Sequence, residues 1–328
     1  MSEMSPQRAG SLFEGLKRRV DPAIATAFGC IIVILIVGSF YSPNFLSPAY
    51  ILQQLKVGSF LGIAASGVML VILLGHIDLS IPWVLTAGAM MGCAAAGLGP
   101  VGSALAVPAG ILVGSCFGLV SGIGVAYLRI PAMIVTLSVN VVAQGLMVVY
   151  SGGFSPQDAA PASMRWLATG FLVPGVPNAI LVWALVGIGI VFMLTRTAYG
   201  RVIYAIGNRE RAAFLSGIPT RRIVMLTFVL SGSLSAFAGV LLAGYASKAA
   251  QSMGDAYLLP SIAAVVLGGT SILGGRGSYL GTVAGVILIT LLQSILSVMQ
   301  MPEAGRQMVY GIVILCMLLL YGRSPTER

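Results

Sequence analysis

Long apolar stretches separated by short polar segments recur along the whole chain. Most are close to the ~20 residues that a helix needs to cross the ~30 Å hydrocarbon core of a bilayer. The pattern predicts an all-α polytopic membrane protein with about ten transmembrane helices. The expected spans are Ala23–Phe40, Ile51–Leu74, Ile81–Leu98, Ser103–Ala126, Ile130–Tyr150, Pro177–Leu194, Ile223–Tyr245, Leu259–Leu273, Ser278–Met299 and Gln307–Tyr321.

Two of these stretches carry a further expectation. Ala23–Phe40 contains no charge and is followed by Tyr41 and Pro43 rather than by a small-residue cleavage site, which favours a retained anchor over a removed signal peptide. Leu259–Leu273 is short and runs into a glycine-rich segment at 274–277. This stretch is therefore predicted to be a broken or partial helix.

The order of the spans predicts an inverted repeat. The second to fifth spans and the seventh to tenth spans each occupy about 100 residues, and five spans separate their starts, so the two blocks enter the membrane from opposite sides. The third span of each block carries glycines at four-residue spacing, which lets a neighbouring helix approach closely. These predicted helix-packing glycines are Gly110, Gly114, Gly118 and Gly122 in the first block and Gly277, Gly281 and Gly285 in the second.

Composition excludes a soluble protein. Of the 328 residues 58% are hydrophobic and only 8% are charged, against about one quarter charged in a soluble domain. We expect one transmembrane domain over residues 1–328, with no room for a soluble catalytic domain. The four cysteines lie singly within apolar stretches, so we expect packing residues rather than disulfides or metal ligands.

The net charge of +9 is explained by orientation in the membrane rather than by nucleic-acid binding. If the amino terminus is cytoplasmic, only Lys56, Arg165, Lys248 and Arg306 lie outside, and the other 14 of the 18 basic residues lie inside. We therefore expect both termini in the cytoplasm. Residues 1–21 form a basic cytoplasmic tail, which is either an amphipathic helix on the membrane surface or a disordered segment.

Catalytic motifs are missing. The segment beginning at Gly269 has the first spacing of a phosphate-binding loop but lacks its lysine, and no zinc-protease or serine-hydrolase motif occurs. No cofactor or metal is expected in this chain.

Few ionisable or amide side chains remain near the spans, where such groups are usually functional. His76, Asp78 and Ser80 could form a proton relay, or Asp78 or Ser80 could cap the following helix. Asn140 and Gln144 share one helical face and either line a polar translocation path or form interhelical hydrogen bonds.

The densest polar segment is the predicted cytoplasmic loop 195–222. Asn208 can cap a short amphipathic helix, and Gly217 with Pro219 would end it. Such a helix favours docking into a groove of another protein, although a solvated basic loop is the alternative. The candidate docking residues are Gly200, Arg201, Tyr204, Gly207, Asn208, Glu210, Ala212, Leu215 and Gly217.

The motifs in this loop resemble those of a known family. Gly200-Arg201-Val202-Ile203-Tyr204-Ala205-Ile206-Gly207, with Glu210, Ala212 and Leu215-Ser216-Gly217-Ile218, is similar to the coupling loop of permease subunits of bacterial ABC importers for ribose and related monosaccharides. Further matches follow in order from residue 41 onward: Ser42-Pro43-Asn44-Phe45, Ile51-Leu52-Gln53-Gln54, Ile77-Asp78-Leu79-Ser80, Pro131-Ala132-Met133-Ile134-Val135-Thr136-Leu137 and Ile262-Ala263-Ala264-Val265-Val266-Leu267-Gly268-Gly269-Thr270-Ser271.

The resemblance implies a type II importer-like permease in the bacterial inner membrane, non-catalytic and present in two copies. It also implies a separate ATPase with two nucleotide-binding domains, which binds ATP and magnesium, and a periplasmic sugar-binding protein. His76, Arg211 and the segment 257–261 depart from the ribose branch, which leaves open the sugar and whether the permease pairs with itself. The alternatives are a stand-alone proton-coupled transporter using His76 and Asp78 and, with no motif in its favour, an intramembrane enzyme.

Overall fold

The computed structural model describes residues 22–153 and 158–321. Its elements are α2 (Pro22–Tyr41), η1 (Pro43–Leu46), α3 (Pro48–Leu73), α4 (Ile81–Ala96), α5 (Gly99–Ala126), α6 (Ala132–Tyr150), α7 (Ala162–Thr169), β1 (Phe171–Val173), β2 (Val176–Pro177), α8 (Asn178–Arg196), α9 (Ala198–Leu215), α10 (Thr220–Ala246), η2 (Asp255–Tyr257), α11 (Leu258–Leu267), α12 (Tyr279–Val298) and α13 (Glu303–Tyr321). The basic tail at 1–21 lies outside the described residues.

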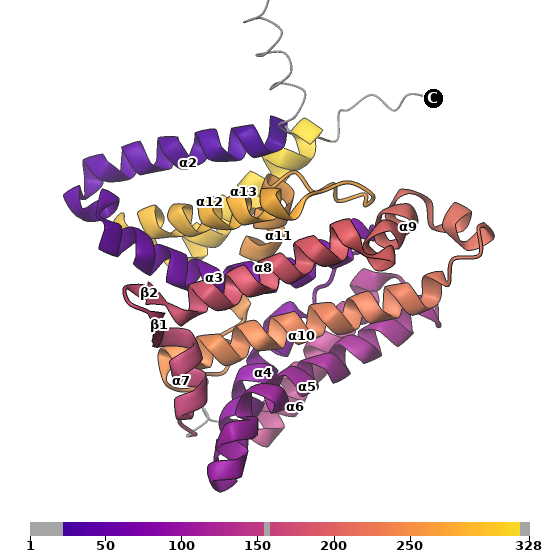
Figure 1. The fold of residues 1–328 in the computed structure, drawn as a ribbon, viewed down its shortest axis with the longest axis horizontal. Coiled ribbons are helices and arrows are strands. Elements are labelled where there is room, and N and C mark those ends of the chain that lie inside the picture. The colour runs from indigo at the N-terminus through magenta and orange to yellow at the C-terminus, as the bar shows by residue number, and fades with distance from the viewer. Residues whose placement is uncertain (1–21, 154–157, 322–328) are drawn as a thin grey trace, which may run out of the picture.

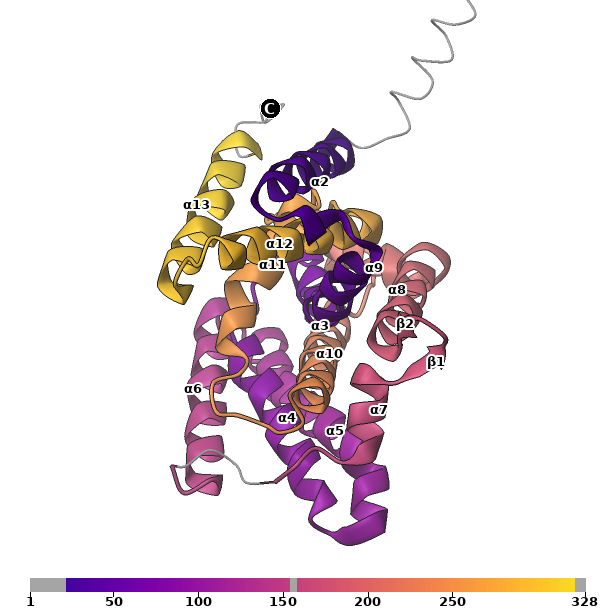
Figure 2. The same ribbon diagram turned by 90° about the vertical axis from the view of Figure 1, so that its left-hand side faces the viewer.

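Two helices form the centre of the bundle. In α3 every residue from Gly58 to Leu73 is buried, and α3 packs directly against α10. Figures 1 and 2 show α2, α12 and α13 on one side of this pair and α4, α5 and α6 on the other. A helix that is apolar on all sides, such as α3, is suited to the centre of a helical bundle.

Six of the described helices are long and apolar enough to cross a membrane: α3, α5, α6, α8, α10 and α12. Three other apolar stretches, 25–41, 81–96 and 255–267, form shorter helices. The exterior of the bundle is rich in exposed leucine, isoleucine and valine, as expected for a surface that faces lipid. The prediction of a polytopic helical membrane protein is confirmed.

The expected span Leu259–Leu273 is a partial helix, as its short length indicated. α11 ends at Leu267, and an irregular loop at 268–278 follows it. Gly269, Gly274 and Gly275 in this loop adopt positive φ angles, which glycine reaches without the steric cost that a side chain would bring. The glycines therefore end the helix and turn the chain back.

The segment between the fifth and sixth spans contains structure that the hydrophobic pattern did not predict. α7 packs against the end of α10, and a two-stranded antiparallel hairpin, β1–β2, leads into α8. In Figure 1 these elements lie at the opposite end of the molecule from α9. The carboxamide of Asn178 binds the backbone of this region, accepting from the Leu172 N–H and donating to the Trp166 carbonyl.

Three cysteines within the described residues are free, and they differ in burial. Cys93 is buried, whereas Cys30 and Cys116 are exposed on the apolar exterior. A thiol behaves as a small apolar group, so both positions suit a lipid-facing surface.

Candidate functional site

α9 lies at one end of the bundle and is bent. The Thr197 hydroxyl accepts from the Gly200 N–H at its start, and Arg209 has non-helical angles (φ −155°, ψ 95°) that divide it into two parts. Gly217, with φ 81°, follows its end. The short helix predicted to begin at Asn208 is therefore the second half of a longer, kinked element.

The first half of α9 rests on two segments that are distant in the sequence. Gly207 lies against the Leu73 carbonyl at the end of α3, where a Cβ would overlap the backbone. The same carbonyl accepts from the Gly275 N–H at 2.9 Å, and the Tyr204 hydroxyl donates to the Gly277 carbonyl at 2.9 Å. A movement of α9 would therefore act directly on α3 and on the loop 268–278.

The outer surface of α9 is basic, with an apolar tip. Arg201, Asn208, Arg209, Arg211 and Ala212 are exposed. Phe214 is 56% and Leu215 79% exposed in the single chain. Gly200 has a different role, because a Cβ there would meet the backbone of Leu194 at the α8–α9 junction. Cations around a protruding apolar tip suit docking onto another protein.

An ion pair ties the second half of α9 to the α5–α6 turn. The Arg129 guanidinium lies 2.6 Å from the Glu210 carboxylate, with the two side chains 48% and 37% exposed. Arg129 has a left-handed backbone (φ 57°), which costs energy for a residue with a side chain. The sequence reasoning missed Arg129; its signal was a single cation between two long apolar stretches.

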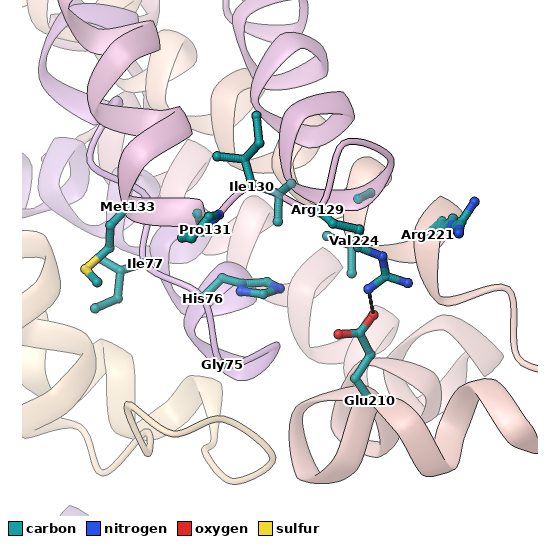
Figure 3. A pocket seen from close by; sticks show the side chains of 13 residues that line it. Gly75, His76, Ile77, Arg129, Ile130, Pro131, Met133, Glu210, Arg221 and Val224 are labelled. Carbon is teal, nitrogen blue, oxygen red and sulfur yellow. Dashed lines mark hydrogen bonds and ion pairs between the residues drawn. The ribbon is translucent and has the colours of Figure 1, made fainter.

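A cavity of about 360 Å³ lies beneath this ion pair, lined by residues that include His76, Arg129, Glu210 and Arg221. Figure 3 shows Arg129 and Glu210 pointing toward each other beside the His76 ring. Burial in the loop 74–80 lowers the pKa of His76, an effect that the negative charge of Glu210 opposes and the positive charge of Arg129 reinforces. His76 is therefore expected to be neutral at pH 7.

Asp78 is buried and anchors the start of α4 to α10. Its carboxylate accepts from the Ser80 N–H at 2.9 Å, from the Ser80 hydroxyl at 2.6 Å and from the Ser231 hydroxyl at 2.9 Å. Within residues 22–153 and 158–321, no hydrogen bond joins Asp78 to His76. The geometry does not support a proton relay through this pair.

The first turn of α4 is capped from α6. Neither the Asp78 nor the Ser80 side chain accepts from an N–H within α4, so the expectation of a side-chain cap at these residues is wrong. The Asn140 carbonyl oxygen accepts from the Trp83 N–H at 3.2 Å, and the Thr136 hydroxyl accepts from the Leu79 N–H at 3.0 Å. Gln144 is exposed on the apolar surface of α6. Asn140 thus forms the interhelical hydrogen bond, while Gln144 does not join it.

The glycines of α5 lie along its crossing with α4 and α10. A Cβ would meet Gly88 and Val240 at Gly110, Gly232 and Ala236 at Gly114, Phe228 at Gly118 and Met225 at Gly122. In the other half, Gly281 and Gly285 contact Gly268 and Ala264 of the α11 segment. Gly277 differs from the expectation, because it precedes α12 and lies in the loop against Thr270.

A second polar cavity, which sequence reasoning missed, lies at the end opposite α9. It measures about 360 Å³ and is lined by Tyr50, Gln54 and Val57 of α3, Thr290, Gln293, Ser294, Ser297 and Val298 of α12, and Arg306 of α13. The signal in the sequence was the spacing of the α12 residues, which recur three and four apart and so share one helical face.

No group of three histidine, cysteine or acidic side chains that could hold a metal ion occurs within the described part of the chain.

These features define the class of protein. A multi-pass helical bundle with an apolar exterior, a basic kinked helix at one end and a cavity at each end fits a membrane permease. The chain belongs to the family described as branched-chain amino acid transport system / permease component, which matches residues 50–318. The family resemblance inferred from the motifs is confirmed.

Individual relatives match over nearly the whole chain. It is 34% identical over 312 residues to the ribose import permease protein RbsC of Bacillus subtilis (strain 168), covering 94% of each chain. It is 33% identical over 294 residues to RbsC of Escherichia coli (strain K12), covering 88% of this chain and 91% of the relative. It is 30% identical over 303 residues to the autoinducer 2 import system permease protein LsrC of Escherichia coli (strain K12 / DH10B), covering 91% and 86%. These relatives are named as permeases and not as enzymes.

Proposed function

We propose that this chain is the transmembrane permease subunit of an ATP-binding cassette importer that carries a monosaccharide or similar small polar solute across the bacterial inner membrane. The single observation that carries the proposal is the structure of α9. This helix is kinked and basic, and it ends in an exposed apolar tip. Its body contacts α3, the loop 268–278 and the α5–α6 turn. The relatives named as ribose and autoinducer 2 import permeases support the class of solute.

The partners follow from this role. A separate ATPase with two nucleotide-binding domains binds ATP and magnesium and docks on α9. A second permease copy completes the path through the lipid bilayer, and a periplasmic sugar-binding protein delivers solute to the end opposite α9. This chain has no catalytic, metal or nucleic-acid site in the proposal.

Force from the ATPase would enter through three contacts. The contact of Gly207 with Leu73 would pass a movement of α9 to α3, and the hydrogen bond from Tyr204 would pass it to the loop 268–278. The ion pair between Glu210 and Arg129 would pass it to the α5–α6 turn. Because α3 and α10 are the central helices, a displacement at α9 would change the packing of both halves. This is the proposed origin of alternating access.

The proposed topology has ten spans in an inverted repeat, with both termini cytoplasmic. Helix packing supports it: α10 of the second half packs against α4 and α5, while α3 of the first half packs against α11 and α12. This exchange is what a pseudo-twofold axis between the halves would produce. α2 begins, and α13 ends, toward the side of the molecule that carries α9 (Figure 1).

Co-purification with the ATPase tests the proposal. Leu215→Ala, at the tip of α9, is expected to reduce recovery of the ATPase and ATP-driven uptake severalfold, because it removes apolar contact area from the interface. Leu112→Ala is the matched control, since Leu112 is 64% exposed on α5 and faces lipid. Uptake of D-ribose by the permease alone, driven by a pH gradient, would contradict the proposal.

A further inference from the structure

The cavity opposite α9 has the chemistry of a solute site rather than of helix packing. Thr290, Gln293, Ser294 and Ser297 place four polar side chains on one face of α12, and Tyr50 and Gln54 of α3 face them across the cavity. Polar groups in a span are costly unless they bond to one another or serve a function. The Tyr50 and Ser294 hydroxyls bond to each other, which fixes one wall of the cavity.

Arg306 adds a buried N–H group that can still donate a hydrogen bond. Its Nη2 lies 2.8 Å from the Glu303 carboxylate, while its Nε is buried without a hydrogen-bond partner among the described residues. An unpaired buried donor costs about 1–3 kcal/mol. A ligand oxygen or a water in the cavity would satisfy it.

We propose that this cavity is a binding site for one uncharged, hydroxylated solute of pentose size on the entry side of the permease. The proposal rests on the proposed function and names the residues that receive the solute there. A sugar hydroxyl both donates and accepts, as do the Gln54 amide and the Ser297 hydroxyl. The Thr290 hydroxyl donates to the Val286 carbonyl and can still accept from a ligand. The Gln293 amide bonds to Tyr310 and keeps further donor and acceptor capacity. The cavity volume lies at the small end of ligand pockets, about 300–1,000 Å³.

Charge argues for a neutral ligand. Arg306 is the one basic residue among the described residues that line the cavity, and Glu303 offsets its charge. An amino acid would leave its ammonium without a dedicated acidic partner in the lining. A sugar requires no such partner.

Protection of an introduced thiol tests the site directly. The complete transporter, with Cys30, Cys93, Cys116 and Cys316 of this chain replaced by serine, is placed in nanodiscs so that a water-soluble thiol reagent reaches both faces. We expect 10 mM D-ribose to slow labelling of Gln293→Cys at least threefold. Gln300→Cys is the matched control, because Gln300 is exposed in the α12–α13 connection just outside the cavity, and its labelling is expected to stay unchanged.

Two results would overturn the assignment: an unchanged labelling rate at position 293 with D-ribose, or protection by L-leucine but not by D-ribose.

A transport assay separates this inference from the proposed function. Gln54→Leu is expected to lower ATP-driven uptake about tenfold at low solute concentration, while Gln300→Leu leaves it at the level of the unmodified protein. Absence of ATP-driven uptake in the unmodified complex would contradict the proposed function, whereas normal uptake in Gln54→Leu would contradict only the site.

Discussion

Asp78, which the sequence offered as a candidate for a proton relay, anchors the start of α4 to α10 in the structure. Two of its three hydrogen bonds come from Ser80 in the same loop 74–80, and the third comes from the Ser231 hydroxyl in the middle of α10. The Asp78 carboxylate accepts from three donors and so links the loop before α4, in the first half of the protein, to α10 in the second half. The same bonds explain why an acidic residue is tolerated at a fully enclosed position.

Substitution of Asp78 separates anchoring from proton transfer. Asp78→Ala leaves the Ser80 N–H and the Ser231 hydroxyl buried and unpaired, at a cost of about 1–3 kcal/mol for each group. We expect a lower unfolding temperature in detergent and a reduced yield. Asp78→Asn keeps the shape and can still bond to both serines, so it should fold and transport. Loss of uptake in a well-folded Asp78→Asn protein would instead favour a protonation role.

The Arg129–Glu210 pair gives a charge-exchange test. Glu210→Arg is expected to insert and fold normally, because an exposed ion pair contributes only about 0–1 kcal/mol, while uptake and ATPase association fall. The double variant Arg129→Glu with Glu210→Arg restores opposite charges and should recover a substantial part of the uptake. Equal uptake in the unmodified protein and the Glu210→Arg variant would show that the pair does not transmit movement.

At the scale of elements, the helices of this bundle are held together by close backbone contact at their crossings. In a water-soluble protein the burial of apolar side chains would drive the same packing. In lipid an apolar side chain gains little by leaving the solvent, so backbone approach and van der Waals contact matter more. The crossing of α5 with α10 depends on Gly114, Gly118 and Gly122, where backbone atoms of α10 occupy the space of a side chain. The four-residue spacing predicted this face, but not which helix would occupy it.

A bulky residue at this crossing should disrupt it. Gly114→Leu would force α5 away from Gly232 and Ala236, and overpacking costs typically ~1–3 kcal/mol and sometimes more. We expect a lower midpoint of thermal unfolding, followed by fluorescence-detected size exclusion. Gly145→Leu in α6 is the control, since nothing lies within 4 Å of a Cβ there. Equal unfolding midpoints for the two variants would contradict the role of the crossing.

For the whole molecule, the distribution of basic residues between the two ends predicts orientation. Arg129, Arg221 and the arginines of α9 belong to one end, while Arg165 and Lys248 lie with α7 and the end of α10 at the other. The positive-inside rule therefore predicts that the α9 end is cytoplasmic.

Reporter fusions test this orientation. A fluorescent protein that matures only in the cytoplasm should be active at both termini and after Gly217. Alkaline phosphatase, which is active only in the periplasm, should be active when inserted at Gly175 in the exposed β1–β2 turn. Phosphatase activity at Gly217 would reverse the topology and place α9 away from the ATPase.

The sequence determined the features that depend on local chemistry. Apolar length and the rarity of charge specified a helical membrane protein, glycine spacing marked the close helix faces, and the order of motifs identified the family. It also located the polar segment 195–222, for which we propose coupling, and the partial helix that ends before 268–278. Each of these follows from residues that are neighbours along the chain.

Only the tertiary structure decided which distant groups meet. Asn140 caps α4, Arg129 pairs with Glu210, and the polar residues of α12 face Tyr50 and Gln54 because helices far apart in the sequence pack side by side. Helical periodicity fixes the face on which a side chain lies but says nothing about which helix covers that face. For this reason the pairing of Asp78 with Ser231, and the cavity at the end opposite α9, became visible only in three dimensions.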